Sequence, residues 1–255
     1  MTNVFREALH RNELVVGAWI QIPHPSVAEI FAAAGFDWIC VDIEHGSIGL
    51  ESMANLFRAI ENGGSTPVAR LPDNDRVWIK RSLDAGAQGL IIPMVNSAEE
   101  AERAVSQANY PPRGERGFGY SRANMYGMDF DSYIRKANND IAMIMQIEHR
   151  EGINQLEDIV RVQGVDGVFI GPLDLSGSYG KTGELECKEM QKALEKYLTV
   201  CRDEGIPAGM HIVRPDLESI TKAVEEGYRL LVLGLDVVFL DEGAKESLSI
   251  LNNEG

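Results

Sequence analysis

The chain has 255 residues, of which 44% are apolar and 25% charged, the size and balance of one large folded domain or two small ones. Its formal net charge of −15 disfavours nucleic acids and anionic membranes as partners, because binding to phosphate groups needs a basic surface. The sequence has no apolar run long enough to predict a membrane-spanning helix. The polar segment Met1–Arg11 lacks the apolar core of a signal peptide. Together with the three widely spaced cysteines, which form no zinc pattern, this predicts a cytoplasmic protein.

Short apolar runs typical of buried strands alternate along the chain with amphipathic helical stretches. This α/β pattern over about 250 residues predicts a single (β/α)8 TIM barrel spanning residues 1–255. A doubly wound sheet is the alternative, but it usually has a glycine-rich loop after its first strand, where this chain has Ile20-Gln21-Ile22-Pro23. The predicted strands are Val15–Gln21, Trp38–Ile43, Pro67–Arg70, Gly89–Ile92, Ala142–Ile147, Gly167–Ile170, Pro207–His211 and Arg229–Leu233. The predicted helices are Pro25–Ala34, Leu50–Asn62, Asp75–Asp84, Ala98–Ala108, Ile153–Arg161, Lys188–Glu204 and Pro215–Glu226.

One long irregular segment runs from Asn109 to Gly127. A stretch of this length without regular structure inside a compact domain is usually functional. We therefore expect it to serve the function, and its Arg116 and Arg122 are candidates for local positive charge toward a substrate carboxylate.

Polar side chains gather where the predicted strands end. In a (β/α)8 barrel the C-terminal ends of the strands form the active face. That face is expected to combine an acid/base group, a guanidinium and carboxylates suited to a metal ion. The strand ends are Asp42-Ile43-Glu44-His45-Gly46, Ala69-Arg70, Gln146-Ile147-Glu148, Gly171-Pro172-Leu173-Asp174, Met210-His211 and Gly234-Leu235-Asp236.

Glu148 and Asp174 follow successive strands and are predicted to share one divalent cation. Mg²⁺ and Mn²⁺ prefer oxygen ligands, usually one or two protein carboxylates together with water and substrate. Two carboxylates leave about four positions open, which suits a chelating 2-oxo acid. A solvated acid at a strand end is the alternative for either residue alone, but the pair favours a metal site.

His45 and Arg70 are the candidates for proton transfer and charge stabilisation. A neutral imidazole can accept a proton near pH 7, since its ordinary pKa is about 6.5. A guanidinium at a strand end can neutralise a developing enolate oxygen or hold a carboxylate. The structural alternatives are a turn histidine bonded to the backbone and an arginine paired with a barrel carboxylate.

Lysine is absent from every predicted strand. A Schiff-base aldolase needs a lysine in or at a barrel strand. If this chain forms a carbanion, a metal ion must therefore act as the electron sink.

Several ordered motifs resemble those of one known family. They are Asp42-Ile43-Glu44-His45-Gly46, Ala69-Arg70-Leu71-Pro72, Leu83-Asp84-Ala85-Gly86-Ala87, Tyr110-Pro111-Pro112-Arg113-Gly114 and Gly171-Pro172-Leu173-Asp174-Leu175-Ser176. These motifs are similar to those of the HpcH/HpaI aldolases, metal-dependent class II pyruvate aldolases that cleave 4-hydroxy-2-oxo acids. The resemblance runs from about Gly17 to Asp236 and implies a divalent cofactor such as Mg²⁺, Mn²⁺ or Co²⁺.

The resemblance also implies roles for the residues at the strand ends. By position, His45 resembles the general base of the family, and Arg70 resembles the residue that stabilises the enolate in the transition state. Glu148 and Asp174 match the metal ligands.

The same resemblance implies how the substrate is bound. Gln146 matches a substrate-binding glutamine. The backbone N–H groups of Leu173 and Asp174 match those that hold the carboxylate of the oxo acid, so Asp174 is expected to serve both the metal and the substrate.

Two acids are candidates for orienting His45. Asp84 matches an acid that raises the basicity of the histidine, but it ends a predicted helix far from the active face of a simple barrel. It is therefore expected to act across a contact between subunits, and Asp42 is a local alternative. His149 stands where relatives usually have a small hydroxyl residue, and packing at a helix start is the favoured interpretation.

The proposed reaction is a retro-aldol cleavage that yields pyruvate and an aldehyde, with a substrate such as 4-hydroxy-2-oxoheptanedioate or a 2-dehydro-3-deoxy sugar acid. The alternatives are an acyl-CoA lyase or an oxaloacetate decarboxylase of the same superfamily, or a non-catalytic metabolite-binding barrel. Family resemblance implies a homo-oligomer, commonly a hexamer with an exchanged C-terminal helix. Val237–Asn253 is capable of forming that helix.

Overall fold

The computed structural model describes residues 3–252 and contains a closed parallel barrel in the strand order β1 to β8. Each strand pairs with the next in sequence, and β8 returns to pair with β1. This architecture confirms the predicted (β/α)8 barrel. The strands are β1 (Val15–Ile20), β2 (Trp38–Asp42), β3 (Thr66–Arg70), β4 (Gly89–Ile92), β5 (Ala142–Ile147), β6 (Gly167–Ile170), β7 (Ala208–Ile212) and β8 (Leu230–Leu235).

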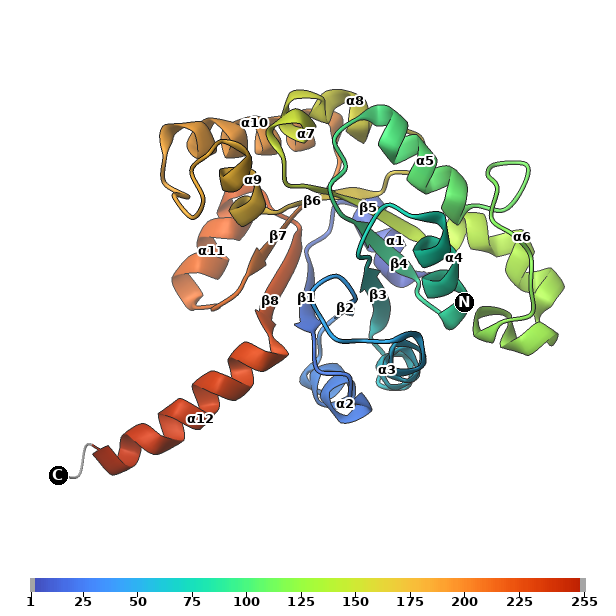
Figure 1. Ribbon diagram of the computed structural model, residues 1–255, viewed down its shortest axis with the longest axis horizontal. Helices are drawn as coiled ribbons and strands as arrows, with labels where there is room; N and C mark the ends of the chain where they lie inside the picture. Colours follow the sequence, from blue (N-terminus) through green and yellow to red (C-terminus); the bar gives the residue numbers. More distant parts are fainter. Residues whose placement is uncertain (1–2, 253–255) are drawn as a thin grey trace.

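Helices surround the barrel, and the last of them, α12, projects away from it (Figure 1). Among residues 3–252, no helix combines the length and apolar character needed to cross a membrane. The helices are α1 (Val4–His10), α2 (Pro25–Ala34), α3 (Leu50–Asn62), α4 (Arg76–Ala85), α5 (Ala98–Ala108), η1 (Arg122–Gly127), α6 (Phe130–Asp140), α7 (Arg150–Asn154), α8 (Leu156–Val160), α9 (Pro172–Ser178), α10 (Lys188–Glu204), α11 (Leu217–Glu226) and α12 (Asp236–Asn252).

The helix prediction was wrong in specific places. The single helix expected over Ile153–Arg161 is two short helices, α7 and α8, because the backbone leaves helical geometry at Gln155 (φ −99°, ψ 14°). Helices α1, α6 and α9 were not predicted, and the long loop contains the short helix η1. The predicted C-terminal helix is confirmed as α12, although Asn253 lies outside the described residues.

Alternate residues of the strands fill the barrel interior with apolar side chains, including Trp19, Trp38 and Phe169. Phe5 and Leu9 of α1 belong to the same cluster, with the Phe5 ring 5.3 Å from that of Trp38. The amide of Asn3, just before α1, donates to the backbone carbonyls of Gln88, which precedes β4, and of Asp140, which ends α6 shortly before β5. Helix α1 therefore closes the N-terminal end of the barrel and leaves polar chemistry to the other end.

Asp166 fastens α1 to that closed end. It precedes β6 and is almost fully buried. Its carboxylate accepts hydrogen bonds from Arg6 Nε at 3.0 Å and the Met143 backbone N–H at 2.9 Å, and lies 2.6 Å from His10 Nε2. A buried carboxylate with several donors is costly to disrupt, so Asp166 is a structural residue remote from the strand C-termini.

Candidate active site

Asp42 ends β2, and its fully buried carboxylate is the centre of a hydrogen-bond network at the active face. It accepts two hydrogen bonds from the Arg70 guanidinium, at 3.0 and 2.6 Å. It also accepts the Gln21 amide at 2.8 Å and the backbone N–H groups of Glu44 and His45 at 3.1 and 3.2 Å. Burial raises the pKa of Asp42, but the hydrogen bonds and charge of Arg70 outweigh burial, so the net pKa is lowered.

This geometry defines what Asp42 does for His45. The carboxylate reaches His45 through the backbone N–H and so fixes the turn that carries the imidazole. Among the contacts of the described residues, none joins the Asp42 carboxylate to the imidazole itself. The observed bonds of Asp42 hold the turn and Arg70, and its part in orienting the imidazole stays a prediction.

Arg70 projects from the end of β3 and is fixed on two sides. Besides its paired bonds to Asp42, its Nε lies 3.4 Å from Glu44 Oε2, and its guanidinium carbon lies 4.7 Å from the ring centroid of Trp19. The side chain is only 14% exposed. Burial lowers the pKa of Arg70, yet the hydrogen bonds and charge of Asp42 raise it overall, so the cation is secure.

Glu148 follows β5, and its carboxylate is held by donors on both oxygens. The Met94 backbone N–H donates to Oε1 at 2.7 Å, and the Gln146 amide donates to Oε2. Gly171 lies against the same group, because a Cβ at that position would lie 2.7 Å from Oε2. Burial raises the pKa of Glu148, and the charges of Glu44 and Asp174 raise it further.

Glu44 is a residue of this site that the sequence analysis did not single out. Its pKa is raised by burial and by the charges of Asp42 and Asp174, although Arg70 lowers it. The available signal was its position two residues after Asp42, which places both on the inner side of a strand end. Its Oε2 and the Oε1 of Gln146 are buried oxygens without a hydrogen-bond partner among the described residues.

These features fit a divalent cation. The negative charge of Asp174 raises the pKa of both Glu44 and Glu148, and the charge of Glu44 raises that of Glu148 further. A cation would relieve this excess of negative charge. Within residues 3–252, no group of three or more His, Cys, Asp or Glu side chains is arranged to hold a metal ion. A site for Mg²⁺ or Mn²⁺ can consist of one or two protein carboxylates when water and substrate supply the other ligands.

Leu173 and Asp174 lie in the first turn of α9, which begins directly after β6. The first hydrogen bond of this helix runs from Leu175 N–H to the Gly171 carbonyl at 3.0 Å, so the two preceding N–H groups are left for a ligand. Both residues are exposed, with Leu173 58% accessible. The turn thus offers both backbone donors and the Asp174 carboxylate to the active face.

His45 occupies the rim of the site. Its side chain is 61% exposed, and its Nε2 lies 3.9 Å from Glu44 Oε2. Gly46 allows the turn after it, because a Cβ there would collide with the Asp42 carbonyl oxygen. The imidazole is therefore accessible to substrate and close to one of the site carboxylates.

Asp84 lies apart from this group. It is in α4, and its carboxylate pairs with Arg116 at 2.9 Å. Arg116 was expected to be available to substrate, but it is 2% exposed and lies 4.6 Å from the ring centroid of Tyr110. Arg122 likewise pairs with an acid of α3. Of the contacts described for residues 3–252, none joins Asp84 to His45, so the local structure does not bring this predicted pair together.

Two further histidines have structural partners. His149 is the N-cap of α7, and its Nδ1 accepts the Glu151 N–H at 3.2 Å, as expected for a residue at a helix start. His211 stacks on Trp19 with ring centroids 5.2 Å apart, and its Nε2 lies 3.0 Å from the Gly234 carbonyl oxygen. His211 therefore supports the wall of the site beneath Arg70.

His211 should make stability depend on pH in the acidic range. Burial, with a smaller contribution from the Arg70 charge, lowers its pKa from 6.5 to about 4. As pH falls through this interval the unfolded chain takes up a proton that the folded chain does not, so the folded state loses stability. We expect a loss on the order of 2 kcal/mol between pH 7 and pH 4.5 that His211→Phe, which retains a stacking ring, does not show.

The measurement is urea unfolding of both proteins at the two pH values. The gap between their free energies of unfolding should change with pH. Parallel curves for the two proteins would show that His211 does not titrate in this way.

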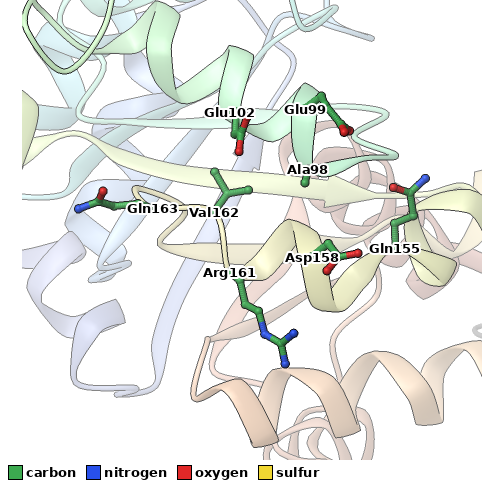
Figure 2. Close-up of a pocket in the computed structure, with 8 residues that line it drawn as sticks. All are labelled: Ala98, Glu99, Glu102, Gln155, Asp158, Arg161, Val162 and Gln163. Carbon is green, nitrogen blue, oxygen red and sulfur yellow. The ribbon is translucent and has the colours of Figure 1, made fainter.

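A separate pocket lies on the outer ring of helices, between α5 and α8 (Figure 2). Its lining includes Glu99, Glu102 and Asp158, with Arg161 as the cation. Figure 2 shows Arg161 pointing away from Glu102, toward α10, where it pairs with Glu204 at 2.6 Å. The residues predicted for chemistry are not part of this lining, so the pocket is not the candidate active site.

Comparisons with known proteins find similar chains along almost the whole sequence. The profile of the HpcH/HpaI aldolase/citrate lyase family matches residues 16–241. A hydroxypyruvate/pyruvate aldolase of Roseovarius nubinhibens is 39% identical over 97% of this chain and 96% of its own length. A 2-keto-3-deoxy-L-rhamnonate aldolase of Shigella dysenteriae is 34% identical over 99% and 94%. The crystal structure of a HpcH/HpaI aldolase/citrate lyase family protein from Burkholderia cenocepacia superposes with a TM-score of 0.93 at 33% identity, over 98% of this chain and 100% of that one.

Proposed function

Because the chain belongs to the HpcH/HpaI aldolase/citrate lyase family, we propose that it cleaves a 4-hydroxy-2-oxo acid to pyruvate and an aldehyde. The enzyme is an aldolase and therefore a carbon–carbon lyase. One observation carries the proposed mechanism: the buried carboxylate of Asp42 bonds both the Arg70 guanidinium and the backbone of His45. A cation and a candidate base are thereby held by one rigid group.

We propose a 2-keto-3-deoxy sugar acid as the substrate class. Relatives that match nearly the whole chain are named for 2-keto-3-deoxy-L-rhamnonate and for hydroxypyruvate or pyruvate. The site is buried at one end and exposed at the other, which suits substrates that share a pyruvate half and differ in the aldehyde half. Glu148 and Arg70 are buried, whereas His45 and Leu173 are exposed. The pyruvate half would bind at the buried groups and the aldehyde half toward solvent.

A divalent metal ion is typical of this family, and we propose that Glu148 and Asp174 hold it here. The Oε1 of Gln146, which has no hydrogen-bond partner among the described residues, and the raised pKa of Glu148 support a cation at this place. When bound, such an ion would act as a Lewis acid that draws electrons toward the 2-oxo group. Mg²⁺, Mn²⁺ and Co²⁺ are the candidates.

The residues of the chain then have separate roles in the proposed cleavage. The N–H groups of Leu173 and Asp174 would bind the C1 carboxylate, and Gln146 would orient the oxo acid. His45 would remove the proton from the C4 hydroxyl, so that the C3–C4 bond breaks and its electrons pass toward the 2-oxo group. Arg70 would stabilise the resulting enolate oxygen until C3 is protonated to give pyruvate.

The test is release of pyruvate from a panel of 4-hydroxy-2-oxo acids, measured with and without chelator. We expect 2-keto-3-deoxy sugar acids to be cleaved, excess EDTA to remove the activity, and Mg²⁺, Mn²⁺ or Co²⁺ to restore it. Full activity in excess EDTA would contradict the metal-assisted route.

The same assay separates the alternatives. With oxaloacetate included, an oxaloacetate decarboxylase would release pyruvate from oxaloacetate but would not cleave the 4-hydroxy-2-oxo acids. A non-catalytic metabolite-binding barrel would release no pyruvate from any of these compounds. An acyl-CoA lyase needs a basic groove for nucleotide phosphates, which a net charge of −15 does not favour.

We also propose a cytoplasmic homo-oligomer, hexameric by family resemblance. Helix α12 projects from the barrel and exposes Leu240, Leu248 and Ile250 (Figure 1). Apolar side chains arranged along a projecting helix favour a protein partner, and exchange of this helix between subunits would cover them.

A further inference from the structure

Asp236 is a buried carboxylate that joins the end of the barrel to the start of α12. It follows β8 directly and is 4% exposed. Its oxygens accept the backbone N–H groups of Gln21 at 3.0 Å, Ile22 at 2.8 Å and Val237 at 2.8 Å. A buried carboxylate with several backbone donors is rigidly placed, and these bonds fix the backbone just after β1.

Gln21 carries this constraint into the active face. Its backbone is held by Asp236, and its side-chain amide donates to Asp42 Oδ2 at 2.8 Å. The same Asp42 oxygen accepts Arg70 Nη2 at 2.6 Å. A continuous chain of hydrogen bonds therefore runs from Asp236 through Gln21 and Asp42 to the guanidinium.

We propose that Asp236 and Gln21 are positioning residues that set the orientation of Arg70 through Asp42. This inference rests on the proposed role of Arg70 at the enolate oxygen. Asp42 is fully buried and shares Oδ2 between two donors, so loss of the Gln21 amide changes both the direction and the rigidity of the carboxylate. A guanidinium that no longer points at the developing charge loses much of its effect, although substrate still binds.

The first test is a double-mutant cycle of Asp236→Asn and Gln21→Met. Asparagine keeps the shape of Asp236 but removes one acceptor oxygen and its charge, and methionine keeps the length of Gln21 without the amide. We expect kcat to fall roughly tenfold to a hundredfold for the first and about fivefold to tenfold for the second, with KM within about twofold. The double variant should fall little below Asp236→Asn alone, because the two residues belong to one chain of contacts.

The second readout follows the environment of Arg70 without relying on activity. The chain has three tryptophans, Trp19, Trp38 and Trp78, so fluorotryptophan labelling gives one fluorine resonance for each. The Arg70 guanidinium lies 4.7 Å from the Trp19 ring centroid, so the Trp19 resonance reports a moved charge. We expect both single variants to shift the Trp19 line and to leave the Trp78 line in place.

Asp166→Asn is the matched control. Asp166 is buried to the same extent, 4% exposed, and also accepts several hydrogen bonds, but at the opposite end of the barrel. It should lower the thermal midpoint while kcat and the Trp19 line stay as in the parent enzyme. A general loss of rigidity would instead lower kcat in all of these variants.

The outcomes separate the two proposals. An unchanged kcat and Trp19 line in both Asp236→Asn and Gln21→Met, or effects on kcat that multiply in the double variant, would overturn the positioning role. A shifted Trp19 line with unchanged kcat would support the positioning of Arg70 and contradict its role in catalysis. A shifted line together with a non-additive loss of kcat supports both.

Discussion

Glu148→Gln should lower kcat/KM by roughly a thousandfold or more and abolish tight binding of a divalent cation. The replacement removes one of the two carboxylates that we propose as metal ligands and substitutes a neutral oxygen, which is a far weaker ligand for a hard cation. Mn²⁺ binding by calorimetry and pyruvate release from the same preparation measure the two effects together.

The fold should survive this substitution. Burial and the charges of Glu44 and Asp174 raise the pKa of Glu148, so the charged carboxylate is disfavoured in the folded protein without a cation. A neutral side chain of the same shape removes that repulsion and keeps an oxygen for the Met94 N–H. Its new NH2 would face the Gln146 amide, which can turn over and accept with its unpartnered Oε1. We therefore expect the metal-free variant to unfold at the same temperature as the metal-free parent or at a higher one, although it loses activity.

Glu151→Gln is the matched control. Glu151 lies three positions after Glu148, is exposed, and pairs only loosely with Arg150 at 3.8 Å. Its replacement should leave kcat/KM and metal binding unchanged. Equal losses in the two variants would show that general charge, rather than the position of Glu148, governs activity.

Arg70→Lys should lower kcat roughly a hundredfold to a thousandfold although the charge is conserved. The guanidinium makes two hydrogen bonds to Asp42, at 3.0 and 2.6 Å, and its carbon lies over the Trp19 ring, 4.7 Å from the ring centroid. An ammonium cannot reproduce the paired bonds and the stacking together, so it cannot hold the same position against a developing oxyanion.

Two comparisons define this result. Arg161→Lys changes an arginine of the outer ring, 60% exposed and paired with Glu204, and should keep full activity. Arg70→Ala should lose more activity than Arg70→Lys, and added guanidinium ion should restore part of it by occupying the vacated place. Failure of guanidinium to restore any activity, together with full activity of Arg70→Lys, would remove Arg70 from the mechanism.

Much of the barrel could be predicted because its strands are buried on both sides. Parallel strands of this kind are short apolar runs, and the predicted strands β4, β5 and β6 have the observed bounds. Helix α1 has only seven residues, and its local signals, the N-cap Asn3 and the apolar residues Phe5, Ala8 and Leu9 at helical spacing, were not used in the sequence analysis. It is held by Asp166, which is distant in sequence.

The site could be predicted only as far as it depends on strand ends. The topology alone brings Arg70, Glu148 and Asp174 to one face, and simple alternation could have added Glu44. The pairing of Asp84 with Arg116 could not be predicted, because it depends on how the long loop folds against α4.

Because helix α1 closes the N-terminal end of the barrel, it limits how substrate enters and how products leave. Phe5 and Leu9 block one end and Trp38 fills the interior above them, so the strand C-termini are the way in for substrate and the way out for both products. If the pyruvate half binds at the buried groups, as we propose, the aldehyde would lie between it and the solvent. Products would then leave in a fixed sequence, aldehyde before pyruvate, and synthesis in the reverse direction would load them in the opposite order.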